Sequence, residues 1–193
     1  MKDASQQQKT TRDAILDATD RLLTRYGYKK MTIDDLAQET GIGKGSVYLH
    51  FPSKEEIALS HIDRIIDRLK ESLRMIGAKP IAADERLRKM LIERVLFRFD
   101  SVQHYTQNLN DMLRYVRPKL LERRKRYFDE EARILATVIA EGQASSTFAK
   151  GDPFDMAQTL VSATNSLLPY SLSAMELGDR TTSASASRKP PRS

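Results

Sequence analysis

The spacing of apolar residues is the feature that most constrains the fold of this 193-residue chain. Leu, Ile, Val and Ala recur every three or four positions through long stretches, and the alternation typical of strands is nearly absent. Glycine and proline fall mainly between these stretches, where they end helices. The pattern therefore predicts an all-α fold.

Helix starts in the first part of the chain are marked by Thr or Ser followed three residues later by Asp or Glu, as in a capping box. The pairs are Thr10 with Asp13, Thr32 with Asp35, and Ser53 with Glu56. They predict a first helix that ends at Gly27, a helix over 33–40 that ends at Gly41, a helix over 44–50, and a long helix reaching about residue 76.

The second part of the chain begins after a joint that contains Pro80. Its apolar spacing predicts helices over about 84–102, 105–116, 118–143 and 153–176. Asp152 and Pro153 suit the N-cap and first position of the last helix, and Pro169 should bend or break it. Residues 1–9 and 178–193 are polar, and we expect both segments to be disordered.

Composition excludes several classes of site. The chain has no cysteine, and its three histidines lie far apart in sequence without metal-ligand spacing. No Ser-His-Asp set and no paired carboxylates are apparent, so we expect no enzymatic activity, no metal and no cofactor. No apolar run is long enough for a membrane helix and no signal peptide is evident, so we expect a cytoplasmic protein without membrane contact.

The net charge of +6 is weak evidence for a nucleic-acid partner. Residues 178–193 hold 4 Lys and Arg against 1 Asp, which is half of the excess. Overall basicity therefore does not identify a DNA-binding face, and the position of individual residues must do so.

The segment GIGKGS, residues 41–46, has the glycines and lysine of a phosphate-binding loop. A nucleotide-binding loop would need Ser or Thr directly after the lysine and a strand before it, whereas Gly45 follows Lys44 and the preceding residues are helical in pattern. Two short helices joined at Gly41-Ile42-Gly43 instead predict a helix-turn-helix. Val47 and Phe51 would then face the core, and the remaining side chains of the second helix would face outward.

The run TIDDLAQETGIGKGSVYLHFPSKEEIAL, residues 32–59, resembles the TetR family of bacterial transcriptional regulators. The resemblance implies a three-helix DNA-binding domain over 10–56, a connecting helix over 53–77, and a helical effector-binding and dimerisation domain over 81–177. It implies a homodimer that binds a palindromic double-stranded DNA operator, most often as a repressor, and releases it on binding a small-molecule effector. A regulator or architectural protein without an effector, and a helical enzyme or carrier, are the alternatives.

The same resemblance assigns roles to individual residues. Lys44 and Ser46 would contact base edges, and Gly45 would allow close approach to the DNA. The residues that would contact phosphates are Thr32, Tyr48, His50 and Lys54. Tyr48 has a core-covering role as its alternative, and His50 a plain surface role. Leu49 departs from the aromatic residue often found at its position in the family.

Candidate effector contacts come from aromatic, methionine and histidine side chains of neighbouring predicted helices, and their alternative is plain core or surface. They are Phe97, Phe99, His104, Tyr105, Met112 and Tyr115. Candidate dimer contacts on the last predicted helix are Ala157, Leu160, Val161, Thr164 and Leu168. The family's usual final helix has no counterpart in the sequence TTSASASRKPPRS. The charged run at 122–131 is interpreted as a solvated outer face.

Overall fold

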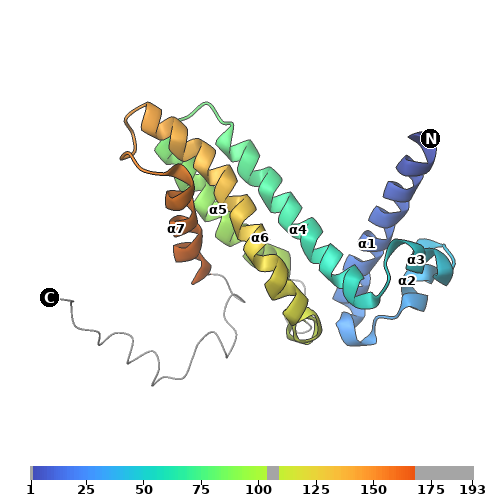
Figure 1. Cartoon of the computed structure of the whole chain (residues 1–193). Coiled ribbons are helices and arrows are strands. Elements are labelled where there is room, and N and C mark those ends of the chain that lie inside the picture. Colours follow the sequence, from blue (N-terminus) through green and yellow to red (C-terminus); the bar gives the residue numbers. More distant parts are fainter. Residues whose placement is uncertain (1, 104–108, 168–193) are drawn as a thin grey trace, which may run out of the picture.

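The computed structural model describes residues 2–103 and 109–167, and this part of the chain is helical with no strand (Figure 1). The helices are α1 (Lys2–Lys30), α2 (Ile33–Thr40), α3 (Lys44–His50), α4 (Lys54–Gly77), α5 (Ala83–Gln103), α6 (Leu109–Ala144) and α7 (Pro153–Asn165). In Figure 1, α1, α2 and α3 form a head at the start of α4, α5 and α6 pack beside the rest of α4, and α7 packs against α6 and α5. None of the described helices is both long and apolar enough to span a bilayer.

Two of the three predicted capping pairs are confirmed, whereas Thr10 lies inside α1 and does not cap it. Thr32 Oγ1 accepts a hydrogen bond from the Asp35 amide, and the Asp35 carboxylate accepts one from the Thr32 amide, which completes a capping box. Gly41 ends α2 in the left-handed conformation with φ 68°, a region that favours glycine. Ser53 accepts from the Glu56 amide at the start of α4.

The first helix differs from its prediction at its beginning. Residues 1–9 were expected to be disordered, but α1 already begins at Lys2. The polar composition of this segment lowers its helix propensity little, since Gln and Lys are good helix formers. Gly27, the expected end, lies at a non-helical break in α1 with φ 73° and ψ 166°, and one more helical turn follows it.

The predicted break between 105–116 and 118–143 is wrong, because α6 runs from Leu109 to Ala144 with Pro118 inside it. Proline removes one helical hydrogen bond and bends a helix, but packing on both sides can keep the helix continuous. Asp152 caps α7 as predicted, through hydrogen bonds from the amides of Phe154 and Asp155. Helix α7 ends at Asn165, and Pro169 and residues 178–193 lie outside the described part of the chain.

Two hydrophobic cores organise the protein. The first lies in the head and also includes Met112 and Val116 of α6, so the head is completed by the C-terminal half of the chain. The second lies among α4, α5, α6 and α7 and is centred on fully buried residues such as Leu73, Met90 and Leu135. Because α4 and α6 contribute to both cores, a displacement of α6 would also change the packing of the head core.

Candidate nucleic-acid interface

The helix-turn-helix is formed by α2, the turn at residues 41–43, and α3. Val47 and Phe51 are fully buried beneath α3, Ala37 is buried in α2, and Ile42 packs partly against the same core. Val47 and Phe51 are the inward pair that the sequence predicts. Because Val47 and Phe51 are buried, the opposite side of α3 faces outward.

The outward side of α3 carries the predicted DNA contacts. Lys44, Gly45 and Tyr48 are exposed, and Ser46 and His50 are half-buried. Tyr48 keeps 47% of its surface accessible, so it does not act mainly as a cover for the core. Leu49 is exposed on the same helix. The sequence analysis assigns it no contact and notes only that it departs from the family pattern.

The Lys44 ammonium is held by a carboxylate of α2. Its Nζ donates to Asp34 Oδ2 at 2.8 Å, and this hydrogen bond and charge raise the pKa of Lys44. Both side chains are exposed, so the pair is open to exchange with another partner. A base contact by Lys44 therefore requires the lysine to leave Asp34 or to extend beyond it.

Lys54 joins α4 to the end of α1. Its Nζ donates to the Lys29 carbonyl oxygen at 3.3 Å and lies 4.5 Å from the centre of the Tyr28 ring. Partial burial lowers the pKa of Lys54. The ammonium thus has a structural partner in the free protein, which the sequence did not reveal.

Thr32 lies exposed at the N-terminus of α2. Its hydroxyl donates to Asp35 Oδ2 at 2.7 Å while accepting from the Asp35 amide at 3.1 Å. The hydrogen bonds from Thr32 lower the pKa of the Asp35 carboxyl. Thr32 is therefore fixed in orientation by its capping role, and its predicted phosphate contact stays a prediction.

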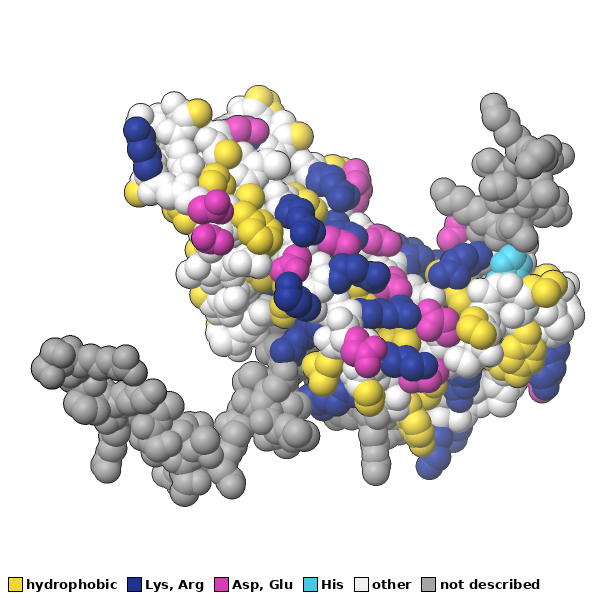
Figure 2. Space-filling model, in the orientation of Figure 1, with side chains coloured by type: hydrophobic (Ala, Val, Ile, Leu, Met, Phe, Trp, Pro, Cys, Tyr) yellow, Lys and Arg dark blue, Asp and Glu magenta, His cyan; other side chains and the backbone are white. Residues whose placement is uncertain are grey.

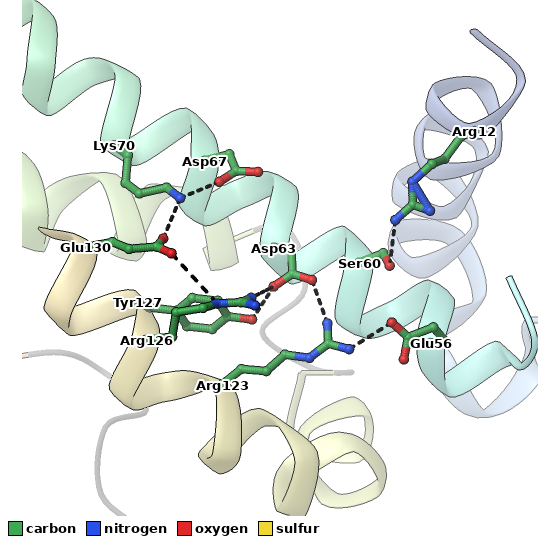
Figure 3. A network of polar contacts seen from close by, with 10 residues as sticks. All are labelled: Arg12, Glu56, Ser60, Asp63, Asp67, Lys70, Arg123, Arg126, Tyr127 and Glu130. Atoms are coloured by element: carbon green, nitrogen blue, oxygen red, sulfur yellow. Dashed lines mark hydrogen bonds and ion pairs between the residues drawn. The ribbon is translucent and has the colours of Figure 1, made fainter. Parts of the chain in front are cut away.

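A network of ion pairs joins α6 to α4 between Glu56 and Lys70 (Figure 3). Arg123 donates to Glu56 Oε1 at 2.8 Å and to Asp63 Oδ2 at 2.5 Å, and the Tyr127 hydroxyl also donates to Asp63. We call this set the α4–α6 network; its members are Glu56, Asp63, Asp67, Lys70, Arg123, Arg126, Tyr127 and Glu130.

The network corrects the interpretation of residues 122–131 as a solvated outer face. Figure 2 shows basic and acidic side chains interspersed over α4 and α6. Arg123 and Tyr127 of this run contact α4, and Glu131 is fully buried. Helical periodicity identifies the polar face of a helix, but it does not say whether that face meets water or a charged neighbouring helix.

A second polar cluster lies inside the C-terminal half. Arg94 and Glu131 are both fully buried, and Arg94 Nε donates to Glu131 Oε2 at 2.7 Å. Arg98 also donates to Glu131, and Arg94 Nη1 donates to Thr164 Oγ1 at 2.7 Å. Burial lowers the pKa of Arg94 to about 10, and Glu131 opposes this shift.

The described members of the predicted effector set are divided between the two hydrophobic cores and the surface. Phe97 packs against the second core, whereas Met112 is buried in the first core. Tyr115 is exposed, and its ring centre lies 5.4 Å from that of Tyr28. The Phe99 side chain, His104 and Tyr105 lie outside the described residues. An effector site built from this set therefore stays a prediction.

The predicted dimer contacts of α7 face the chain's own interior. Ala157 and Val161 are buried in the second core, Leu160 packs against it, and Thr164 binds Arg94. Leu168 lies outside the described residues. The sequence predicts the apolar side of α7 as a surface for a second copy, but α5 and α6 of the same chain bury Ala157 and Val161, which leaves a partner almost no area on them. Leu160 and Thr164 are half-buried, and their dimer contact stays a prediction.

Comparisons with known proteins agree with the geometry of the head. Residues 15–60 match the family described as bacterial regulatory proteins, tetR family. The HTH-type transcriptional regulator EthR of Mycobacterium tuberculosis is 32% identical over 71 residues, which cover 37% of this chain and 33% of EthR. The biofilm operon icaADBC negative transcriptional regulator IcaR of Staphylococcus aureus is 32% identical over 94 residues, 49% of each chain.

Solved structures extend the likeness to the helical half. A transcriptional regulator from Cytophaga hutchinsonii superposes with a TM-score of 0.66 at 24% identity, over 78% of this chain and 76% of that one. A TetR/AcrR-family regulator from Thermobifida fusca gives a TM-score of 0.59 at 25% identity, over 79% and 81%. By contrast, the chain spans only about a third of the length of a curated relative such as EthR. The head therefore carries an N-terminal domain of the tetR family of bacterial regulatory proteins, and the described helices share the fold of these solved regulators.

Proposed function

We propose that this protein is a DNA-binding transcriptional regulator, and that it acts as a repressor on a near-palindromic operator. The observation that carries the proposal is the recognition helix α3, which presents Lys44, Gly45 and Tyr48 to solvent above the buried Val47 and Phe51. The names of EthR and IcaR describe transcriptional regulators, and IcaR a negative one, which supports this class of activity. We infer no catalytic role.

In the proposed complex, two copies of α3 enter successive major grooves. The half-site centres would then lie roughly 34 Å apart, one turn of B-DNA, or a multiple of it. Lys44 and Ser46 would contact base edges, with Gly45 allowing close approach. The phosphate contacts would come from Thr32, Tyr48, His50 and Lys54.

A small-molecule effector would act through α6. This helix completes the head core with Met112 and Val116 and also holds α4 through Arg123. An effector that binds a displaced α6 more tightly would favour a head orientation that no longer fits the operator. A regulator without an effector is the second candidate. A thermal-shift screen distinguishes the two, because a compound that both stabilises the protein and releases DNA requires an effector site.

Binding assays with single variants test the DNA-reading role of α3. Tyr48→Phe and Lys54→Ala should weaken binding to all sequences, since phosphate contacts carry no sequence information. Lys44→Ala should change sequence preference at one base pair of each half-site. Lys150→Ala is the matched control, because Lys150 is exposed in the loop before α7. An unchanged preference with Lys44→Ala would contradict the proposed base contact.

A further inference from the structure

Leu49 is exposed on the recognition helix without a partner in its own chain. Its accessible fraction of 86% is the largest among the exposed large apolar side chains of the described residues. The neighbouring apolar residues of the head, Val47 and Phe51, are fully buried. Single exposed apolar side chains are ordinary on protein surfaces, so the exposure of Leu49 alone assigns it no role. Its place on the seven-residue recognition helix is what bears on function.

Helical geometry places Leu49 at the outermost line of α3. At about 100° per residue, its side chain points about 160° away from that of the buried Val47. Gly45 lies one turn earlier on the same line, since residues four apart share a helix face. A Cβ at Gly45 would meet no atom within 4 Å, so this part of the face is open.

The Gly45–Leu49 line has no side chain that can donate or accept a hydrogen bond. Hydrogen-bonding side chains lie beside it, on Lys44, Ser46, Tyr48 and His50. The edges of the base pairs in the major groove carry donors and acceptors, and the C5-methyl of thymine is their apolar group. A polar base edge opposite Leu49 would lose water without gaining a hydrogen bond, whereas a thymine methyl would gain an apolar partner.

We propose that Leu49 reads the C5-methyl of a thymine in each half-site, and that Gly45 lets α3 approach closely enough for this contact. Leu49 is then a specificity-determining residue, which rests on the proposed DNA-binding function. The occupant is DNA because Leu49 lies on the same exposed face as Lys44 and Tyr48, continuous with the helix-turn-helix interface.

Uracil differs from thymine only by the missing methyl, so it isolates the proposed contact. Each thymine of a selected operator is replaced by deoxyuridine, one position at a time and symmetrically in both half-sites, and the dissociation constant is measured. For the wild-type protein, substitution at one of these positions should raise the dissociation constant about fourfold per half-site. The rise should be about fifteenfold when both half-sites are changed, as expected for the loss of one buried methyl group in each.

The Leu49→Ala variant completes the test. It should bind the thymine operator more weakly, and it should bind the thymine and uracil operators equally at that position. Tyr48→Phe is the control and should keep the full loss on uracil substitution. Because Leu49 is exposed, Leu49→Ala should keep the wild-type melting temperature, which a thermal melt verifies.

Three results would overturn the inference. Wild-type binding that no uracil substitution weakens would show that no methyl is read. An equal loss in wild type and Leu49→Ala would assign the methyl contact to another residue. If wild-type protein selects no DNA sequence at all, the proposed function fails and the inference fails with it, which distinguishes that failure from the first two.

Discussion

Replacing Glu131 with glutamine should remove a large share of the protein's stability. The Glu131 carboxylate is fully buried between α5 and α6, and it accepts hydrogen bonds from both Arg94 and Arg98. Arg94 is also fully buried. Glutamine keeps nearly the same shape, so the substitution removes the negative charge and creates no large cavity. Two guanidinium groups would then share the site without a counter-charge.

The size of the stability loss follows from the burial of the Arg94–Glu131 ion pair. Removing one partner of a buried ion pair costs about 3–5 kcal/mol, because the remaining charge is left in a poorly solvated place. Total stabilities are about 5–15 kcal/mol, so the loss would be a third or more of the total in most cases. For a chain of this size, each kcal/mol corresponds to about 2–4 °C, so the melting temperature should fall by roughly 6–20 °C.

Urea denaturation followed by circular dichroism measures the change. Glu122→Gln is the matched control, because Glu122 is exposed on the same helix, and its effect should stay within about 0.5 kcal/mol. A loss of less than about 1 kcal/mol for Glu131→Gln would show that the two arginines are solvated or compensated, and would refute the view that this pair is sealed in the core.

Three further predictions concern the end of α6, a buried histidine of α4, and the helix-turn-helix. Gly142→Ala should destabilise the protein by about 1–3 kcal/mol in urea, because the new Cβ would lie 2.2 Å from the Phe148 ring, and an unchanged midpoint would contradict this packing. Burial lowers the pKa of His61 from 6.5 to about 4. As pH drops through this range, the unfolded chain binds a proton that the folded chain does not. The free energy of unfolding should therefore fall between about pH 6.5 and pH 4, by up to about 1.4 kcal/mol per pH unit. His61→Asn should flatten that slope, and a slope equal to the wild type's would exclude His61 as its source. Asp34→Asn should tighten binding to all DNA and strengthen the salt dependence of binding, because the change frees Lys44 and removes a negative charge near the phosphates. A fluorescence-anisotropy titration measures both effects. Weaker binding would instead show that Asp34 positions Lys44 for its contact.

Local signals in the sequence predict the head well. The Thr32–Asp35 capping box, the left-handed Gly41 and the inward pair Val47 and Phe51 each depend on residues within a few positions of one another. Such short-range chemistry is the same wherever the segment lies in the fold. The bounds of α2 and α3 therefore agree with the pattern to the residue.

Long-range contacts are what the sequence does not reveal. Arg94 and Glu131 are 37 positions apart, and Arg123 and Asp63 are 60 apart. A charged helix face can meet water or another helix, and an apolar stripe can be covered by the same chain or by a second copy. For this reason the pattern predicts the α7 stripe containing Ala157 and Val161 as a surface for a second copy, and only the three-dimensional arrangement shows that α5 and α6 bury these two residues.

Selection of bound sites from a random DNA library at near-physiological salt tests the central claim most directly. The proposed regulator should enrich an inverted repeat whose half-site centres are separated by about one helical turn or a multiple of it. A single enriched half-site would contradict the proposed dimer while leaving recognition by α3 intact. The absence of any enriched sequence would contradict the proposal that this protein is a sequence-specific DNA-binding regulator.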